Sequence, residues 1–245
     1  MTTVIKFLVG TAVAFMFASC DFGFSIGQVN GNGNVIEYNL NITEGFTNVD
    51  ASSGWDVYLS KGDKTTVIAE TDENLLDLLE VEVHGNTLRI KTKDRENIGR
   101  ASSKKVHVTY VDDLENISAS SGADVVATDV IEGESLRLDA SSGADIKAEA
   151  MVRRISLEAS SGADIDLRGG AETVELDVSS GADIDAQDLK AEDVTAEASS
   201  GGGIKIWAGN SISARASSGG DVEYWGNPKK TDIPKSVSGN VKKRG

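Results

Sequence analysis

Proline and cysteine are nearly absent from this chain of 245 residues. Both prolines, Pro228 and Pro234, stand close to the C-terminus. Proline removes a backbone hydrogen-bond donor, so its absence upstream of Pro228 leaves the chain free to pair strands without interruption. The single cysteine, Cys20, excludes an internal disulfide, which means that packing and hydrogen bonds must hold the fold together.

Aromatic side chains and positive charge are also scarce. Aromatics make up 5% of the residues, and the net charge is −15. An acidic surface repels the phosphates of nucleic acids and of anionic lipid headgroups, so we expect no nucleic-acid partner. Hydrophobic residues nevertheless reach 39%, which is the proportion of a folded domain rather than of a disordered chain.

Two sequence features of common catalytic sites are missing as well. There is no glycine-rich phosphate loop and no cysteine nucleophile, and the two histidines, His84 and His107, fall in strand-like or turn-like segments. We therefore predict no catalytic residues, no metal and no cofactor.

The N-terminus has the pattern of an export signal. Lys6 precedes the apolar run FLVGTAVAFMFAS, which is too short for a membrane span and is typical of a signal peptide. The residues Phe17-Ala18-Ser19 before Cys20 resemble the lipobox of bacterial lipoproteins, in which the cysteine is lipidated after cleavage. We predict a lipoprotein signal peptide over 1–19, a lipid anchor at Cys20 that attaches the protein to the outer membrane, and a flexible tether over 20–33. The alternative is an ordinary signal peptide with a chance cysteine.

A short motif recurs along the chain. It reads ASSGWDV at 51–57, and it returns with small changes at 119–125, 140–146, 159–165, 178–184, 198–204 and 216–222. From Ser120 onward the intervals between copies are similar but not equal, whereas the copy at 51–57 stands alone upstream. A unit this short cannot bury an apolar side alone and has to stack on copies of itself.

The residues beside each motif alternate with period two. Leu136, Leu138 and Ala140 are separated by Arg137 and Asp139, and later repeats follow the same pattern, which is typical of half-buried strands. The fold class that we predict is all-β, a right-handed parallel β-helix (solenoid) of about 18–21 residues per coil, with Ser-Ser-Gly at a tight corner. Gly-x-Asp occurs once per coil, which argues against calcium-binding rolls of nine-residue period, and the unequal coils argue against left-handed hexapeptide helices.

All variation in coil length lies between one corner and the strand that leads to the next. We expect variable loops there, for example at 151–154 and 187–193, and a loop edge is a natural place for recognition. Residues 34–115 are β-rich without the short repeat, with a hairpin turn at His84-Gly85-Asn86 and a helical turn near 72–76. We expect this half to form irregular coils or a cap, residues 116–228 to form the repetitive β-helix, and 229–245 to form a basic C-terminal tail or cap.

Two sets of residues are candidates for function. One aspartate follows most corners, at Asp124, Asp145, Asp164, Asp183 and Asp221, with Gly203 interrupting the column. We interpret the column as structural, each carboxylate accepting backbone N–H groups at its own corner, and the alternative is a ladder for divalent cations. The aromatic residues Trp207, Tyr224 and Trp225 are a candidate binding surface, although they are also suited to capping the core or to joining copies of the chain through the solenoid ends.

Several segments together resemble a known family. The stretches FTNVDASSGWDVYLSKGD, TDENLLD and VEVHGNTLRIKT, the repeated SSGAD corners and the closing GDVEYWGNP are similar to the putative auto-transporter adhesin, head GIN domain family of Bacteroidota. The resemblance implies an exported β-helical protein, commonly a lipoprotein. It leads us to expect a non-catalytic adhesin that binds a glycan or protein ligand, on the periplasmic side or on the cell surface. A passive envelope scaffold and a polysaccharide-active enzyme are the alternatives.

Overall fold

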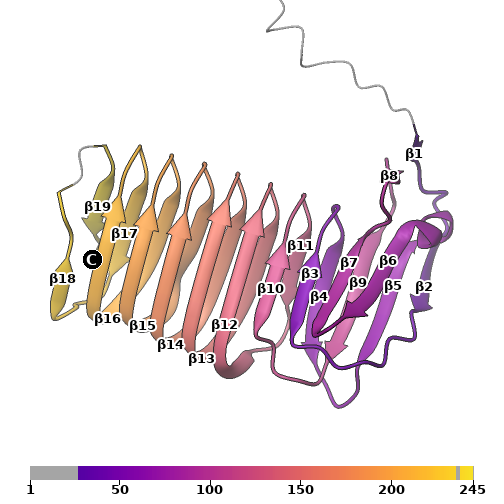
Figure 1. The fold of residues 1–245 in the computed structure, drawn as a ribbon, viewed down its shortest axis with the longest axis horizontal. Helices are drawn as coiled ribbons and strands as arrows, with labels where there is room; N and C mark the ends of the chain where they lie inside the picture. Colours follow the sequence, from indigo (N-terminus) through magenta and orange to yellow (C-terminus); the bar gives the residue numbers. More distant parts are fainter. Residues whose placement is uncertain (1–26, 236–237, 245) are drawn as a thin grey trace, which may run out of the picture.

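The computed structural model describes residues 27–235 and 238–244. The predicted signal peptide, residues 1–19, and the predicted lipid anchor Cys20 lie outside the described residues. The described chain is a β-solenoid of about seven turns, as predicted, with a row of narrow corners along one edge (Figure 1). Of the strands in these residues, 17 belong to one continuous hydrogen-bonded sheet.

Each coil has a stretch of strand before its Ser-Ser-Gly corner and another after it, and these stretches build two faces. The pre-corner face consists of β3 (Asn48–Ala51), β10 (Asn116–Ala119) and the later parts of β12 (Ile131–Ser141), β13 (Asp145–Ser160), β14 (Asp164–Val178), β15 (Asp183–Ala198) and β16 (Gly203–Ala216). The post-corner face consists of β4 (Asp56–Lys61), β11 (Asp124–Ala127), the first parts of β13 to β16, β17 (Asp221–Trp225) and β19 (Asn240–Lys243). Both faces pair in parallel, so equivalent residues of successive coils lie side by side.

The corner is a tight turn that the sequence encodes directly. At Ser141-Ser142-Gly143-Ala144, the central residues have φ values of 55° and 68°, and the N–H of Ala144 donates to the carbonyl of Ser141 at 3.3 Å. Two consecutive left-handed residues are the requirement of a type I′ turn, and glycine meets it without steric cost. The same backbone geometry returns at every later repeat.

Successive corners are joined by their own ladder of hydrogen bonds. The N–H of Gly143 donates to the carbonyl of Ser161 in the next coil at 3.2 Å, and Gly162 donates in the same way to Ser180. Each Ser-Ser-Gly bend therefore lies directly against the next one, which confirms the predicted stacking.

The core is a set of ladders of buried apolar side chains. On the pre-corner face, Leu157 lies between Leu138 and Leu176, and all three are at most 1% exposed. On the post-corner face, Ile165 lies between Ile146 and Ile184 in the same way. Burying each such side chain contributes about 1.5–3 kcal/mol, so the period-two pattern supplies most of the driving force for stacking.

The early motif copy at 51–57 joins the stack directly, although a long stretch without the motif separates it from the next copy. Ala51 pairs with Ala119, and Asp56 pairs with Asp124. The intervening residues form the N-terminal end of the solenoid. There, β9 (Lys104–Tyr110) pairs with β4, and β5 (Thr66–Asp72) and β2 (Val35–Asn39) add antiparallel strands to it.

The predicted hairpin and helical turn are both part of this N-terminal end. Strands β6 (Leu79–His84) and β7 (Thr87–Thr92) form the hairpin, with Gly85 at a φ of 62° in its turn, and β7 pairs with β3. A 3₁₀ helix, η1 (Glu73–Leu78), connects β5 to β6. A small parallel pair, β1 (Gln28–Val29) and β8 (Asn97–Ile98), lies beside them. These elements form the irregular, β-rich N-terminal half that the sequence predicts.

The C-terminal residues add part of a further coil. Strand β18 (Lys230–Asp232) pairs with β16, and β19 pairs with β17. Side chains of Lys242, Lys243 and Arg244 are exposed on or beside the last strand. Charged side chains on an edge strand oppose pairing with further strands, so this end is both closed and basic.

The predicted variable loops are wrong. Residues 151–154 and 187–193 lie within β13 and β15 and pair with neighbouring coils. Differences in coil length are absorbed as register shifts, such as the one between Asp166 and Gly169 in the pairing of β14 with β15. Gly169 has a φ of 114°, and a side chain there would collide with the carbonyl of Ala150, so only glycine fits this bulge.

Candidate functional site

The aspartate column exists and is longer than predicted. Register places Asp145 between Asp124 and Asp164 and places Asp183 beside Asp164. Asp56 of the early motif adds one more carboxylate next to Asp124. Asp56 holds the same position in its motif copy as the other column aspartates hold in theirs, so the sequence already marked it as a candidate. Only the long-range pairing of β4 with β11 shows that it belongs to the column. Beyond Gly203, Asp221 resumes the column.

The carboxylates of the column perturb one another. Partial burial raises the pKa of Asp124, and the neighbouring Asp56 raises it further. Burial likewise raises the pKa of Asp145, together with Asp124 and Asp164, although a backbone N–H of Asp164 opposes this. The pKa of Asp183 is raised by burial and by Asp164. The column is thus a row of like charges that costs stability at neutral pH.

The expected role of these aspartates at their own corners is not what the structure shows. The N–H groups of Asp145, Asp164 and Asp183 donate to carbonyls of the preceding coil at 3.1 Å, so strand pairing has already satisfied the corner backbone. The backbone N–H of Asp164 lowers the pKa of the Asp145 carboxylate, and this contact also runs between coils. Within residues 27–235 and 238–244, no three Asp, Glu, His or Cys side chains converge as metal ligands would.

The Gly203 interruption opens a shallow hollow in the post-corner face. Its volume is about 520 Å³, and its lining includes Gly202 and Gly203, which stand where most other coils carry Ala and Asp. Asp183 and Asp221 flank it, and a side chain at Gly203 would collide with the carboxylate of Asp183. Lys205 lines the same hollow and forms an ion pair with Asp185 at 3.1 Å.

The aromatic residues of the last coils point in different directions. Tyr224 faces the core and is 7% exposed, so its place in the predicted binding surface is wrong. Strand alternation is the reason, because Val222 and Tyr224 share the inner side of β17 while Trp225 takes the outer side. Trp207 and Trp225 are partly exposed neighbours in the register of β16 with β17, so these two do reach the surface.

Basic side chains border the two tryptophans. Lys190 pairs in register with Trp207, and its ammonium group lies 4.8 Å from the centre of the indole. On the other side, Arg244 follows β19 and donates its backbone N–H to the carbonyl of Tyr224, the residue before Trp225, while its guanidinium forms an ion pair with Glu223. We call Lys190, Trp207, Trp225 and Arg244 the aromatic strip. It crosses the last coils of the post-corner face.

Two glycines leave room for the Trp207 ring in this strip. A Cβ at Gly209 would approach the ring to 3.0 Å, and one at Gly226 would approach it to 3.2 Å. Gly226 also has a φ of 93°, a conformation that other residues adopt only with strain. The ring is therefore held against backbone, which fixes its orientation.

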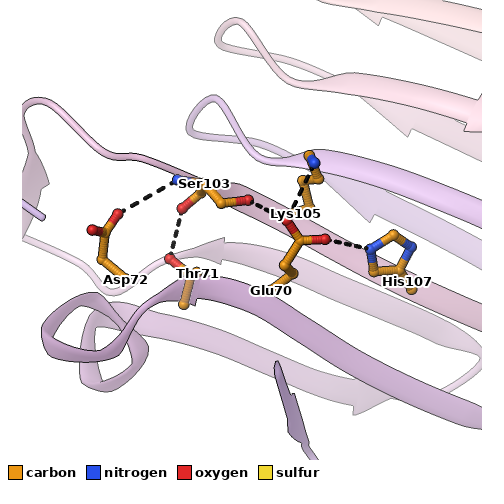
Figure 2. A network of polar contacts seen from close by, with 6 residues as sticks. All are labelled: Glu70, Thr71, Asp72, Ser103, Lys105 and His107. Carbon is orange, nitrogen blue, oxygen red and sulfur yellow. Dashed lines mark hydrogen bonds and ion pairs between the residues drawn. The ribbon is translucent and has the colours of Figure 1, made fainter. Parts of the chain in front are cut away.

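A polar network at the N-terminal end joins β5 to β9 (Figure 2). The carboxylate of Glu70 accepts hydrogen bonds from Ser103 Oγ at 2.9 Å and Lys105 Nζ at 3.2 Å, and it contacts His107 Nε2 at 3.3 Å. These contacts, led by Ser103, lower the pKa of Glu70. The His107 ring also stacks on Tyr58, with centroids 5.2 Å apart. The network has a structural role, since every member is engaged by its neighbours.

Asp72 continues this network and holds the N-terminal segment. Its carboxylate accepts the backbone N–H groups of Gly33 and Ser102, each at 2.6 Å. Burial alone raises the pKa of Asp72, but these N–H groups outweigh burial and lower it. Asn30 adds a hydrogen bond from Arg100 N at 2.9 Å. Residues 28–33, which we expected in a flexible tether, are therefore fastened to the solenoid.

Comparison with known proteins places the chain in a family. A family profile described as "Putative auto-transporter adhesin, head GIN domain" matches residues 45–228. The chain belongs to this family. The predicted resemblance is confirmed, and the matched residues span the solenoid described above. No functionally curated protein matches the chain.

Crystal structures of several relatives share the fold. A putative adhesin from Bacteroides fragilis is 21% identical and superposes with a TM-score of 0.81 over 88% of this chain and 100% of its own. A putative adhesin from Parabacteroides merdae is 18% identical, with a TM-score of 0.71 over 89% of this chain and all of its own. A putative lipid binding protein from Parabacteroides distasonis is 18% identical, with a TM-score of 0.70 over 89% of this chain and all of its own. Among the described residues, no helix has the length and hydropathy to span a membrane.

Proposed function

We propose that this protein is a non-catalytic lipoprotein of the outer membrane that binds a glycan or protein ligand as an adhesin does. Membership of an adhesin family supports export and a binding role. The lipobox-like residues before Cys20 support lipid attachment, which anchors a protein through buried methylene groups at about 0.8 kcal/mol each.

The observation that carries a binding role is the outward orientation of Trp207 and Trp225 beside basic side chains. Exposed aromatic rings at an ordered surface are typical of ligand-binding patches, because each ring buries a large apolar area on contact. A polysaccharide hydrolase needs two carboxyl groups that face each other across a cleft. Here the column carboxylates follow the solenoid axis, and the hollow that Asp183 and Asp221 flank is shallow rather than a cleft, so binding is favoured over hydrolysis.

The position of the N-terminal segment supports an orientation of the solenoid relative to the membrane. Residues 20–28 extend at most about 30 Å, and from Gln28 onward the chain is hydrogen-bonded to the N-terminal end. In the post-corner face the strands from β2 to β19 stack over about 50 Å at the usual spacing. With Cys20 in the membrane, the C-terminal end with its aromatic strip is the end that points away from the lipid.

Fractionation and binding test the proposal separately. Wild-type protein is expected in the outer-membrane fraction, and Cys20→Ser is expected in the soluble fraction, since the variant lacks the acylated thiol. Purified full-length protein is then applied to an array of glycans and matrix proteins. Saturable binding supports the adhesin role, while wild-type protein that binds nothing on the array leaves the passive scaffold as the better account. Membrane attachment of Cys20→Ser would refute the anchor.

A further inference from the structure

We propose that the aromatic strip and the basic C-terminal end together bind an anionic polysaccharide. This inference rests on the proposed binding function and specifies its ligand class. The strip is a continuous surface feature because its residues occupy adjacent register positions: Lys190 beside Trp207, Trp207 beside Trp225, and Arg244 beyond them. Three strand spacings make it about 14 Å long, which suits a short run of sugar rings.

The chemistry of the strip matches a sugar that carries acid groups. The C–H face of a pyranose ring packs on an indole, and a carboxylate or sulfate group pairs with ammonium or guanidinium groups beside it. Lys190 already places its charge 4.8 Å from the Trp207 ring. Next to Trp225, Arg244 forms an ion pair with Glu223 and Lys242 lies in register beside the same carboxylate, so two cations face one acid there. A neutral glycan would use the indoles and gain nothing from these charges.

Charge segregation restricts the ligand to this end of the molecule. Residues 229–244 contain six of the 24 lysines and arginines of the chain and a single acid, Asp232, whereas the whole chain has a net charge of −15. Lys229, Lys230 and Lys235 are exposed in the same segment. The β19 strand and the strip lie at the opposite end from β1 (Figure 1), so the proposed orientation presents the basic surface outward.

The carboxylates around the strip explain why a glycan fits better than a nucleic acid. A single nucleic-acid strand carries a charge about every 3.4 Å, and its continuation past the strip would meet carboxylates such as Asp183 and Asp185. An acidic polysaccharide also exposes hydroxyl groups between its charges. Hydroxyl groups can donate hydrogen bonds to those same carboxylates, so the acidic surroundings favour it.

The test measures binding of purified full-length protein to immobilised polygalacturonate at low and moderate salt. Neutral dextran and single-stranded DNA serve as the other ligands. We expect saturable binding to polygalacturonate, weaker at higher salt, and no binding to dextran. Trp225→Ala should raise the Kd about tenfold, as loss of one stacked ring does. Lys242→Glu should raise it several-fold and reduce its salt dependence.

Two controls keep the outcome clear. Tyr58→Ala removes an outward aromatic ring at the far end, where it stacks on His107, and should leave binding unchanged. Urea unfolding of each variant reports whether the fold persists, and Lys242→Glu supplies an answer if Trp225→Ala does not fold. Absence of polygalacturonate binding, equal binding of DNA, or unchanged affinity of both Trp225→Ala and Lys242→Glu would overturn the proposal. Saturable binding of another ligand in that case would leave the adhesin function standing.

Discussion

Substitution of Asp145 by Asn should make this protein more stable at neutral pH. Asp145 lies in register between Asp124 and Asp164, so its charge faces two like charges across strand spacings of about 4.8 Å. Coulomb repulsion at that distance is about 0.9 kcal/mol per pair in water. The side chains are exposed enough for solvent and salt to screen them, which reduces the expected gain to about 0.5–1.5 kcal/mol in total.

The pH dependence of the gain follows from the raised pKa of Asp145. A carboxyl group whose pKa is higher in the folded state favours folding most below its unfolded pKa, and this advantage is lost as pH rises through the folded value. The wild-type protein therefore carries the penalty at neutral pH, and the asparagine variant does not. As pH falls through the raised pKa, Asp145 becomes neutral, and the two proteins should converge.

Urea unfolding in low-salt buffer measures the effect. In thermal unfolding of a domain of this size, a change of 1 kcal/mol in stability corresponds to a shift in Tm of about 2–4 °C. Salt near 1 M, where the screening length is about 3 Å, should remove most of the gain. Asp166→Asn is the matched control, because Asp166 pairs with Lys147 at 3.3 Å and should lose a little stability or none. An Asp145→Asn variant no more stable than this control at low salt would refute the repulsion argument.

Three further predictions concern the corner, the core and the N-terminal segment. Ser161 has a φ of 56°, so Ser161→Val should cost about 1–3 kcal/mol in urea unfolding, while Ser161→Gly should not destabilise; equal effects would contradict the turn assignment. Leu157→Ala removes a fully buried rung of the core and should lower the free energy of unfolding by about 3–5 kcal/mol, and a loss below that of a surface substitution would argue against the ladder. Asp72→Asn should speed amide hydrogen exchange in residues 29–33 without affecting the repeats. Hydrogen bonds lower the pKa of Asp72, so in the wild type the protection of these amides from exchange should be lost as pH falls through that low pKa. Unchanged exchange would show that other contacts hold the segment.

The repeats were predictable because their information is local. A recurring motif, alternating apolar positions and a Ser-Gly pair at each corner indicate coil, strand and turn without knowledge of distant residues. The same alternation, counted from the buried Val222, places Tyr224 inside and Trp225 outside. The prediction of one aromatic surface failed because it grouped these residues by their proximity in the sequence. The predicted loops at 151–154 and 187–193 are wrong for another reason. Insertions in these segments keep their strand pairing through bulges, as at Gly169, so variation in coil length does not require loops.

Period and composition thus account for an acidic all-β solenoid with stacked corners, because every coil satisfies its backbone by the same local rule. The partners of non-repeating strands follow no such rule. Asp56 enters the aspartate column, and Asp72 fastens residues 28–33, through contacts between segments that lie far apart in the sequence. The aromatic strip likewise arises when β15, β16, β17 and the segment after β19 adopt one register and bring Lys190, Trp207, Trp225 and Arg244 side by side. Which segments pair depends on the burial and hydrogen bonding of the whole molecule, and that balance exists only once the chain has folded.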